Sequence, residues 1–364
     1  MSTDKALQIF DQLVTSIGLY NCEYWLPLIM TKKSFSNSDS TFSYWGNLQV
    51  ETINQKICRM ILGVQKKSSR LGTLGELGRF PLFVKGLCHV LKFHALICQS
   101  EGKGTLISHA VAEMKSSVSS QSPNNSWFGR IEKLKENLNI NYQKNSKIDS
   151  IGFHIKKQVK SKFENFWLAE INKVKPGPDN LNHNKLRYYA TFKGCFKREE
   201  YINLVPNRSQ RSDLTRLRIS SSRLGVEILR YRRPKIPENQ RYCRYCTPSG
   251  NDNHLPGYVD NELHLLVSCS SFTLKRNCLF GRMESIRPGF LALPPNQKAA
   301  TLLCPTSVLT AKLSNKYISI LFNIRKKLDE GVPALNIGYK YGVLVSNEFY
   351  DDNLDSCTNG DLLL

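Results

Sequence analysis

The chain has 364 residues, with 51 Lys and Arg against 30 Asp and Glu and a net charge of +21 at pH 7. This length is enough for two or three domains with apolar cores, and the excess of positive charge indicates a polyanionic partner such as nucleic acid. The longest uncharged, apolar-leaning stretch, residues 299–311, has only 13 residues and contains a proline, so we expect no membrane-spanning segment.

The N-terminal residues and the cysteines indicate a reduced compartment. The first residues, MSTDKALQIFDQ, include an early Asp and a polar interior, unlike a secretory signal. The 11 cysteines are odd in number, and several, such as Cys58, Cys88 and Cys98, lie in apolar stretches typical of buried free thiols. We therefore expect an intracellular protein, nuclear or cytoplasmic, that is not secreted.

Apolar residues recur at helical spacing along most of the first half of the chain. The segments that show this pattern are 4–20, 48–63, 83–99, 127–138 and 151–171, and the last also has a basic face. Residues 26–43 are predicted to be a polar linker and residues 116–126 a low-complexity loop. His89 and His94 are interpreted as structural, since no Cys or carboxylate partners them at ligand spacing.

In the second half, helices are again expected. Ser212 and Asp213 resemble a helix N-cap for the segment with Arg216 and Arg218, and residues 308–328 have an apolar stripe. Strand patterns are few and short. We therefore predict a mainly α fold.

Four residues have the spacing of a metal site. They are Cys243, Cys246, His264 and Cys269, a C-x2-C pair followed by H-x4-C. A spacer rich in Pro, Gly and Asn separates the two halves, and a metal can order such a loop where apolar burial cannot. Thiolate and imidazole ligands in a tetrahedron suit Zn²⁺, and four protein ligands make the site structural rather than catalytic. His254 in the spacer is the rival to His264, and Cys278 is expected to be a bystander.

A basic region precedes and adjoins these ligands. Residues 185–241 contain 15 Lys or Arg against 5 Asp or Glu. Cations that neutralise phosphate and rings that stack on bases suit the binding of RNA or DNA. Most of the rings in this region belong to the core in the alternative interpretation, and we expect only one or two to be exposed, with Tyr242 and Tyr245 as the candidates. The predicted nucleic-acid contacts are Arg216, Arg218, Arg230, Arg232, Arg233, Lys235, Arg241, Arg244, Tyr242 and Tyr245. The alternative is a zinc-stabilised module that binds acidic protein. No small-molecule substrate is expected.

Four blocks resemble, in order, the C-terminal region of reverse transcriptases from LINE-type, non-LTR retrotransposons. The blocks are ALQIFDQLVTSIGLYNCEYW from residue 6, LQVETINQKICRMILGVQKKSSRLGTLGELGRFPL from residue 48, KLRYYATFK from residue 185 with LRISSSRLGVEILRYRRPKIPENQRYCRYC from residue 217, and NELHLLVSC from residue 261. In the last block Ser270 and Asn261 depart from the family pattern, which places Pro and Asp there. The resemblance favours His264 over His254 and implies a helical thumb-like region, connecting bundles, a small zinc-stabilised module and a C-terminal helix.

The resemblance also implies a division of the chain and a lack of catalysis. The FYDD run at 349–352 lies after the zinc region, whereas the family places its paired magnesium-binding carboxylates in a palm before the first block. We therefore expect no catalytic residues in this chain. The expected regions are 1–115 (thumb-like), 116–180 (linker and basic helices), 181–290 (basic region with the zinc module), 291–330 (C-terminal helix) and 331–364 (acidic, disordered tail).

Overall fold

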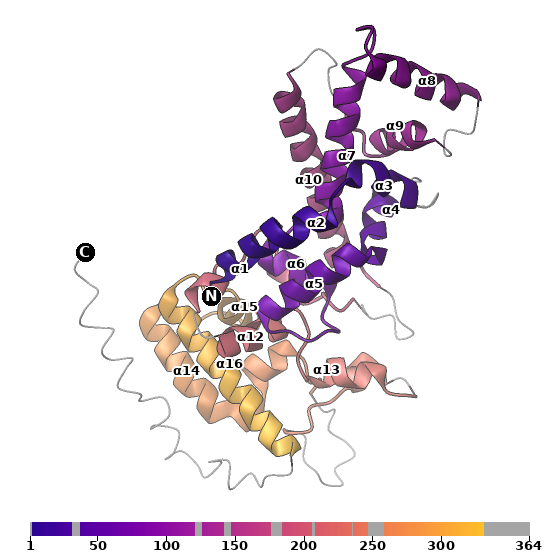
Figure 1. Cartoon of the computed structure of the whole chain (residues 1–364). Coiled ribbons are helices and arrows are strands. Elements are labelled where there is room, and N and C mark those ends of the chain that lie inside the picture. Colours follow the sequence, from indigo (N-terminus) through magenta and orange to yellow (C-terminus); the bar gives the residue numbers. More distant parts are fainter. Residues whose placement is uncertain are drawn as a thin grey trace, which may run out of the picture. The chain divides into compact units, whose positions relative to one another are not determined.

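A computed structural model of the chain describes residues 2–30, 37–120, 126–141, 147–175, 184–205, 208–234, 236–246 and 258–330. Within these residues the regular structure is helical, and the only extended pairing is two isolated bridges. The predicted mainly α fold is therefore confirmed. The described residues of Met1–Val174 and Asn184–Glu199 form a first compact unit, and those of Glu200–Leu364 belong to a second (Figure 1). The predicted acidic tail lies outside the described residues.

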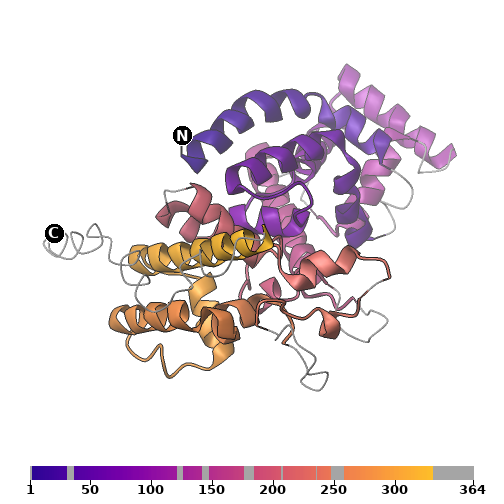
Figure 2. The same ribbon diagram turned by 90° about the horizontal axis from the view of Figure 1, so that it is seen from below.

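The first unit is a helical array around α7 and α10, which lie side by side (Figures 1 and 2). Its elements are α1 (Thr3–Phe10), the π-helical η1 (Asp11–Thr15), α2 (Ser16–Gly18), α3 (Cys22–Ile29), α4 (Ser38–Ser43), the 3-10 turn η3 (Tyr44–Asn47), α5 (Gln49–Leu62), α6 (Arg70–Leu77), α7 (Leu82–Cys98), α8 (Leu106–Ser120), α9 (Trp127–Asn137), α10 (Ile148–Asn172) and the 3-10 turn η4 (Tyr189–Thr191).

Aromatic rings from distant segments form the core of this unit. The Trp167 ring packs against the Phe196 ring, with their centroids 5.1 Å apart, and the centroid of the Phe163 ring lies 5.5 Å from that of Phe196. Trp167 also donates from Nε1 to the Leu71 carbonyl at 3.0 Å. A Cβ on Gly75 would lie 2.5 Å from the Trp167 ring, so this position requires glycine for α6 to approach α10 closely.

A buried carboxylate caps α7. Glu51, on α5, accepts a hydrogen bond from the Phe83 N–H at 2.6 Å and another from Asn54 at 3.1 Å. It therefore satisfies a backbone donor at the first turn of α7 that has no partner within the helix. Burial raises the pKa of Glu51 to about 7, against the lowering effect of these hydrogen bonds.

The raised pKa predicts a specific pH dependence of stability. Because the folded-state pKa of about 7 lies above the ordinary value of 4.5, the folded chain binds a proton that the unfolded chain releases. The free energy of unfolding should therefore fall as the pH rises from 4.5 to 7. Glu51→Gln should lack this contribution, with a difference between the two proteins of up to about 3 kcal/mol over this range.

Urea unfolding at several pH values, followed by tryptophan fluorescence, measures this difference. All four tryptophans precede residue 175, so the signal reports the first unit. The exposed Glu136 on α9 offers a matched control, and Glu136→Gln should keep the wild-type slope. A Glu51→Gln protein with the wild-type slope would show that the buried carboxylate stays ionised.

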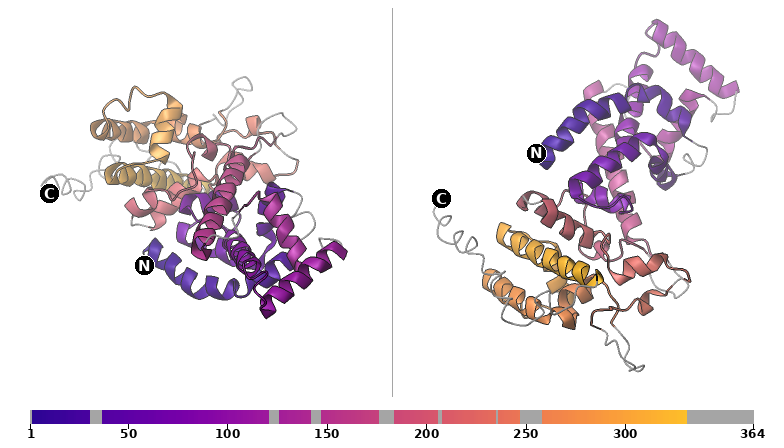
Figure 3. Two further views of the ribbon diagram at one scale, coloured as in Figure 1. Left: turned by 90° about the horizontal axis from the view of Figure 1, so that it is seen from above. Right: turned by 60° about the horizontal axis from the view of Figure 1, so that its bottom comes forward.

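The second unit is organised around its last helix, α16, which packs against α11, α12, α14 and α15 (Figures 2 and 3). A capping box begins α16, since the Ser307 hydroxyl accepts from the Thr310 N–H and the Thr310 hydroxyl accepts from the Ser307 N–H. The elements are α11 (Tyr201–Leu204), α12 (Arg208–Arg218), α13 (Gly225–Ile228), η5 (Leu229–Tyr231), η6 (Glu238–Gln240), the π-helical η7 (His264–Ser268), η8 (Ser270–Phe272), α14 (Thr273–Ile286), α15 (Pro295–Leu303) and α16 (Val308–Asp329).

Several predicted boundaries differ from the structure. The predicted linker at 26–43 contains the end of α3 and all of α4, and α8 continues to Ser120 inside the predicted loop at 116–126. The predicted boundary at residue 115 falls within the first unit, and residues 184–199 belong to that unit rather than to the zinc region. The helix α4 and the end of α8 were not predicted because their sequences are rich in Ser. Serine favours caps and loops unless tertiary packing overrides that preference.

Candidate metal centre

Two of the four predicted ligands lie on a short hairpin. An isolated antiparallel bridge pairs Tyr242 with Val259. On either side of it, the Cys243 N–H donates to the Tyr258 carbonyl at 2.8 Å and the Asp260 N–H donates to the Arg241 carbonyl at 2.9 Å. This pairing fixes the position of Cys243, and a turn that follows contains Cys246.

The other two ligands lie at the two ends of a single π-helical turn, η7. The Asn261 side chain accepts from the His264 N–H at 2.8 Å and caps the start of the turn. At its end the Cys269 N–H donates to the His264 carbonyl at 2.7 Å. The Arg276 guanidinium donates to the Cys269 carbonyl at 2.7 Å, which fixes the position of Cys269 from α14.

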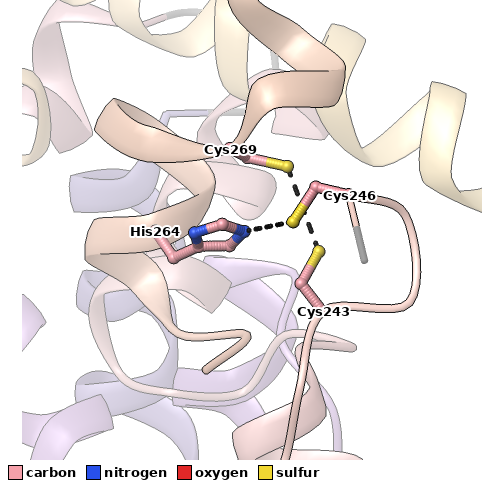
Figure 4. A group of neighbouring side chains, drawn as sticks. All are labelled: Cys243, Cys246, His264 and Cys269. Carbon is pink, nitrogen blue, oxygen red and sulfur yellow. Dashed lines mark hydrogen bonds between the residues drawn. The ribbon is translucent and has the colours of Figure 1, made fainter. Parts of the chain in front are cut away.

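The four side chains converge on one point (Figure 4). Their ligand atoms all lie within 4.8 Å of one another. The Sγ atoms of Cys243 and Cys269 are 4.0 Å apart, and Cys246 Sγ lies 3.2 Å from Nε2 of His264. Metal–sulfur bonds of about 2.3 Å in a tetrahedron place two sulfurs about 3.8 Å apart. The group could therefore hold a metal ion with little rearrangement.

The site is well shielded from solvent. Cys243, Cys269 and His264 are buried, and Cys246 is half-buried. The Tyr258 ring stacks on the His264 imidazole at 5.5 Å and 13° between planes, which holds the ring with Nε2 toward the thiols. The rival ligand His254 lies outside the described residues, and Cys278 on α14 is not part of the cluster.

Without a metal, the three thiols would compete for one negative charge. Hydrogen bonds from Cys269 and His264 stabilise a thiolate at Cys243 and hold its pKa well below the ordinary value of a thiol. The hydrogen bond to that thiolate, together with burial, raises the pKa of Cys269. Burial and the Cys243 charge likewise raise the pKa of Cys246. A dication would remove this competition, because it stabilises every thiolate that it binds.

A buried ion pair that the sequence did not reveal supports the hairpin. Arg325, on α16, donates from Nη1 and Nη2 to the two carboxylate oxygens of Asp260 at 2.8 and 2.6 Å. The Asp260 carboxylate also accepts from the Gly225 N–H at 2.6 Å. Both charged side chains are buried, and Arg325 lies over the Tyr245 ring, 4.4 Å from its centroid. The last helix thus fixes the hairpin that carries Cys243.

Two predicted nucleic-acid contacts are wrong, because their guanidiniums are buried and bonded to the protein itself. Arg218 donates to the Leu303 carbonyl at 2.5 Å and is fully buried. Arg241 donates to the carbonyls of Ile236 and Val226 at 2.8–3.0 Å, and it too is buried. These arginines stabilise loops and are not accessible to phosphate.

The other predicted contacts divide into paired and accessible groups. Arg216 pairs with Asp213 at 3.2 Å and Arg230 with Glu227 at 3.1 Å. The Asp329 carboxylate accepts hydrogen bonds from both Arg244 and Tyr245. Arg244 is nevertheless exposed, whereas Tyr245 is half-buried rather than exposed as predicted. Arg232, Arg233 and Tyr242 are exposed and lie outside these pairs, whereas Lys235 lies outside the described residues.

The first unit also brings cysteines and carboxylates to both histidines of α7, although the sequence interpretation found no such partners for them. Nδ1 of His89 lies 3.5 Å from Glu23, and these two residues form a group with Cys22 in which all ligand-type atoms lie within 4.8 Å. The buried His94 lies 3.1 Å from Glu132 and 3.7 Å from the Cys98 sulfur. Sequence spacing missed Glu23 and Glu132 because they come from other helices, whereas Cys98 lies one turn after His94 on α7 itself.

Comparisons of the chain with family models, curated proteins and solved structures found no match. The reverse-transcriptase resemblance therefore stays a prediction.

Among the described residues no single helix is long and apolar enough to cross a membrane. Only α6 and α7 taken together, with a bend of 74° between them, reach the length and the apolar composition of a membrane span.

Proposed function

We propose that the four-residue cluster binds one structural Zn²⁺. Three thiols and one imidazole match the ligand preference of zinc, and four protein ligands close a tetrahedral site. The convergence of all four ligand atoms within 4.8 Å supports this proposal. Residues 247–257 connect the two halves of the site, and a metal that bridges these halves would stabilise the fold without bulky apolar packing.

We further propose that the chain is a nucleic-acid-binding protein related to the C-terminal region of non-LTR retrotransposon reverse transcriptases, located in the nucleus or cytoplasm. The observation that carries this proposal is the exposure of Arg232 and Arg233, together with that of Tyr242, which directly precedes the cluster residue Cys243. Among the described residues neither arginine has an ion-pair partner, so both cations are available to phosphate. The Tyr242 ring adds a surface on which an unpaired base can stack.

The chain itself is proposed to bind without catalysis. A polymerase needs carboxylates that hold paired magnesium ions, and the potential metal clusters among the described residues contain at most one carboxylate. Asp351 and Asp352, from the FYDD run, lie outside the described residues. Purified protein should therefore extend no primer on an RNA template with magnesium or manganese. Incorporation that disappears when both aspartates are changed to Asn would contradict this part of the proposal.

Binding itself is tested with the zinc-loaded whole chain and a fluorescent single-stranded RNA. We expect dissociation constants of roughly 10⁻⁴–10⁻⁶ M at physiological salt, the range of non-specific phosphate contacts. Unlabelled RNA should displace the probe, whereas a polyglutamate of equal charge should not, because it lacks bases and phosphate geometry. Displacement by polyglutamate alone would instead favour the alternative, a zinc-stabilised module that binds acidic protein.

A further inference from the structure

A cavity of about 680 Å³ lies within the first unit, far along the sequence from the metal ligands. Its walls come from α1, the loop between α6 and α7, α7 itself, and α10. This volume is within the range of about 300–1,000 Å³ that is typical of small-molecule sites. A ligand of nucleotide size would therefore fit, although the sequence predicted no small-molecule ligand.

The cavity wall carries more positive than negative charge. Its cations are Arg79, Lys85, Lys92, Lys156 and Lys160, and its carboxylates are Asp11 and Asp149. Asp11 is already bonded to both Arg79 and Lys85 at 2.8 Å. Although burial opposes ionisation, the hydrogen bonds from these two cations hold the pKa of Asp11 well below its usual range. The Asp11 carboxylate is thus already paired with two of the five cations, Arg79 and Lys85.

Two of the remaining lysines form no ion pair with any residue that the structure describes. They are Lys156 and Lys160, which lie one turn apart on α10. The Nζ of Lys160 lies 4.6 Å from the centroid of the Phe80 ring. Burial, together with the charge of Lys156, lowers the pKa of Lys160. Two like charges one turn apart destabilise a helix, so an anion bound between them would be stabilising.

A glycine brings a third cation to the same face of α10. Gly152 precedes Lys156 by four residues, so both lie on one side of the helix. A Cβ at Gly152 would lie 3.1 Å from Cδ of Lys92 and 3.2 Å from its Cε. Glycine therefore leaves room for the Lys92 side chain, whose one ion-pair partner among the described residues, Asp149, is fully exposed and 3.8 Å away. Such a weak surface pair leaves Lys92 able to bind another anion.

The cavity also offers apolar and aromatic surface. Leu7, Leu77 and Val84 line it, and Phe80 stands beside Lys160. Phe153, from the same helix as the lysines, lines it while 65% of the residue remains exposed. An exposed ring beside unpaired cations is the arrangement expected where a planar group stacks next to a phosphate.

We propose that this cavity binds a small phosphorylated ligand of nucleotide size, with its phosphomonoester on Lys156 and Lys160 and its planar body against Phe153. The site does not depend on the metal centre or on the exposed arginines of the second unit. The phosphomonoester could belong to a free nucleotide or to the phosphorylated end of an oligonucleotide. Both sources present the same terminal dianion to the two lysines.

Calorimetric titration of the whole chain with adenosine 5′-monophosphate tests the proposal. We expect saturable binding at one site per chain, and at least a tenfold loss of affinity in the Lys156→Gln/Lys160→Gln protein. The matched control is Lys157→Gln/Lys162→Gln, which removes the same charge from residues of α10 that do not line the cavity, and it should bind as wild type. Phe153→Ala should weaken binding of the nucleotide but not of inorganic phosphate, which separates the ring contact from the charge contact.

Competition then identifies the source of the phosphomonoester. A short oligonucleotide with a 5′-phosphate that displaces the nucleotide far better than its unphosphorylated form would assign the site to strand ends. No displacement by either would assign it to free nucleotides. Equal displacement by both forms, equal loss of binding in the two double variants, or no saturable binding to folded wild-type protein would overturn the proposal. Unchanged tryptophan fluorescence verifies folding, since the tryptophans all lie in this unit.

Discussion

Cys246→Ser is expected to reduce bound zinc from one ion per chain to none. Cys246 is the one half-buried ligand of the four, so a hydroxyl there disturbs the metal-free fold least, yet it removes one of the four bonds to the metal. Structural zinc contributes on the order of 10–16 kcal/mol of binding free energy in small modules. The variant should consequently lose several kcal/mol of stability in the second unit, as should wild-type protein treated with a chelator.

Cys278→Ser is the matched control for this prediction. Cys278 is a half-buried cysteine of the same unit that lies on α14, outside the cluster. It should retain one zinc per chain in elemental analysis. A Cys246→Ser protein that retains stoichiometric zinc, or a Cys278→Ser protein that loses it, would show that the metal is bound by a different set of residues.

Arg325→Ala is expected to destabilise the second unit by about 3–5 kcal/mol, because it leaves the Asp260 carboxylate buried without a counter-charge. Arg325 contacts Asp260 in a bidentate manner at 2.8 and 2.6 Å, and both side chains are buried. Removing one partner of such a buried pair costs more free energy than removing one partner of a surface pair. The same change should weaken zinc binding, because the backbone N–H of Asp260 donates to the carbonyl of Arg241, two residues before Cys243, and so joins the two sides of the hairpin. Thermal unfolding followed by far-ultraviolet circular dichroism and by zinc release measures both effects.

Two further variants distinguish the ion pair from simple loss of packing. Lys327→Ala, two residues further along α16 and exposed, should change the free energy of unfolding by less than about 0.5 kcal/mol. Asp260→Asn combined with Arg325→Met removes both charges and should be more stable than Arg325→Ala alone. If the double variant were as unstable as the single one, the buried charge would not be the cause of the loss.

Long apolar stripes explain why part of the fold could be predicted from the sequence. The predicted segments 48–63, 83–99, 151–171 and 308–328 correspond to α5, α7, α10 and α16 within three residues at each end. Each has one buried apolar face, which the 3.6-residue period reveals. The helix α14 was not predicted, since the buried face that includes Leu279 and Met283 also contains the charged Arg276.

The cluster of potential metal ligands was predictable because the spacing of its residues is local, whereas the residues that support the cluster are distant in sequence. Cys243 and Cys246 lie at a single turn, and His264 and Cys269 lie at the two ends of a π-helical turn. The short spacing within each pair therefore determines most of the arrangement of the four side chains. Asp260 and Arg325 are 65 residues apart, and nothing in either local sequence distinguishes them from surface charges. Charge density likewise could not separate the buried Arg218 and Arg241 from the exposed Arg232. The two buried guanidiniums donate to backbone carbonyls that the tertiary structure brings to them.

The salt dependence of RNA binding tests the central claim, that the exposed Arg232 and Arg233 of the second unit contact nucleic acid. The Arg232→Gln/Arg233→Gln protein should show a log–log slope of affinity against salt that is shallower by about 0.7 per lost phosphate contact, or about 1.4 in total for single strands. The control is Lys66→Gln/Lys67→Gln, an adjacent exposed pair in the first unit with the same change in charge, and its slope should stay at the wild-type value. An unchanged slope in the arginine variant, or an equal change in both proteins, while zinc content remains at one per chain, would contradict the claim.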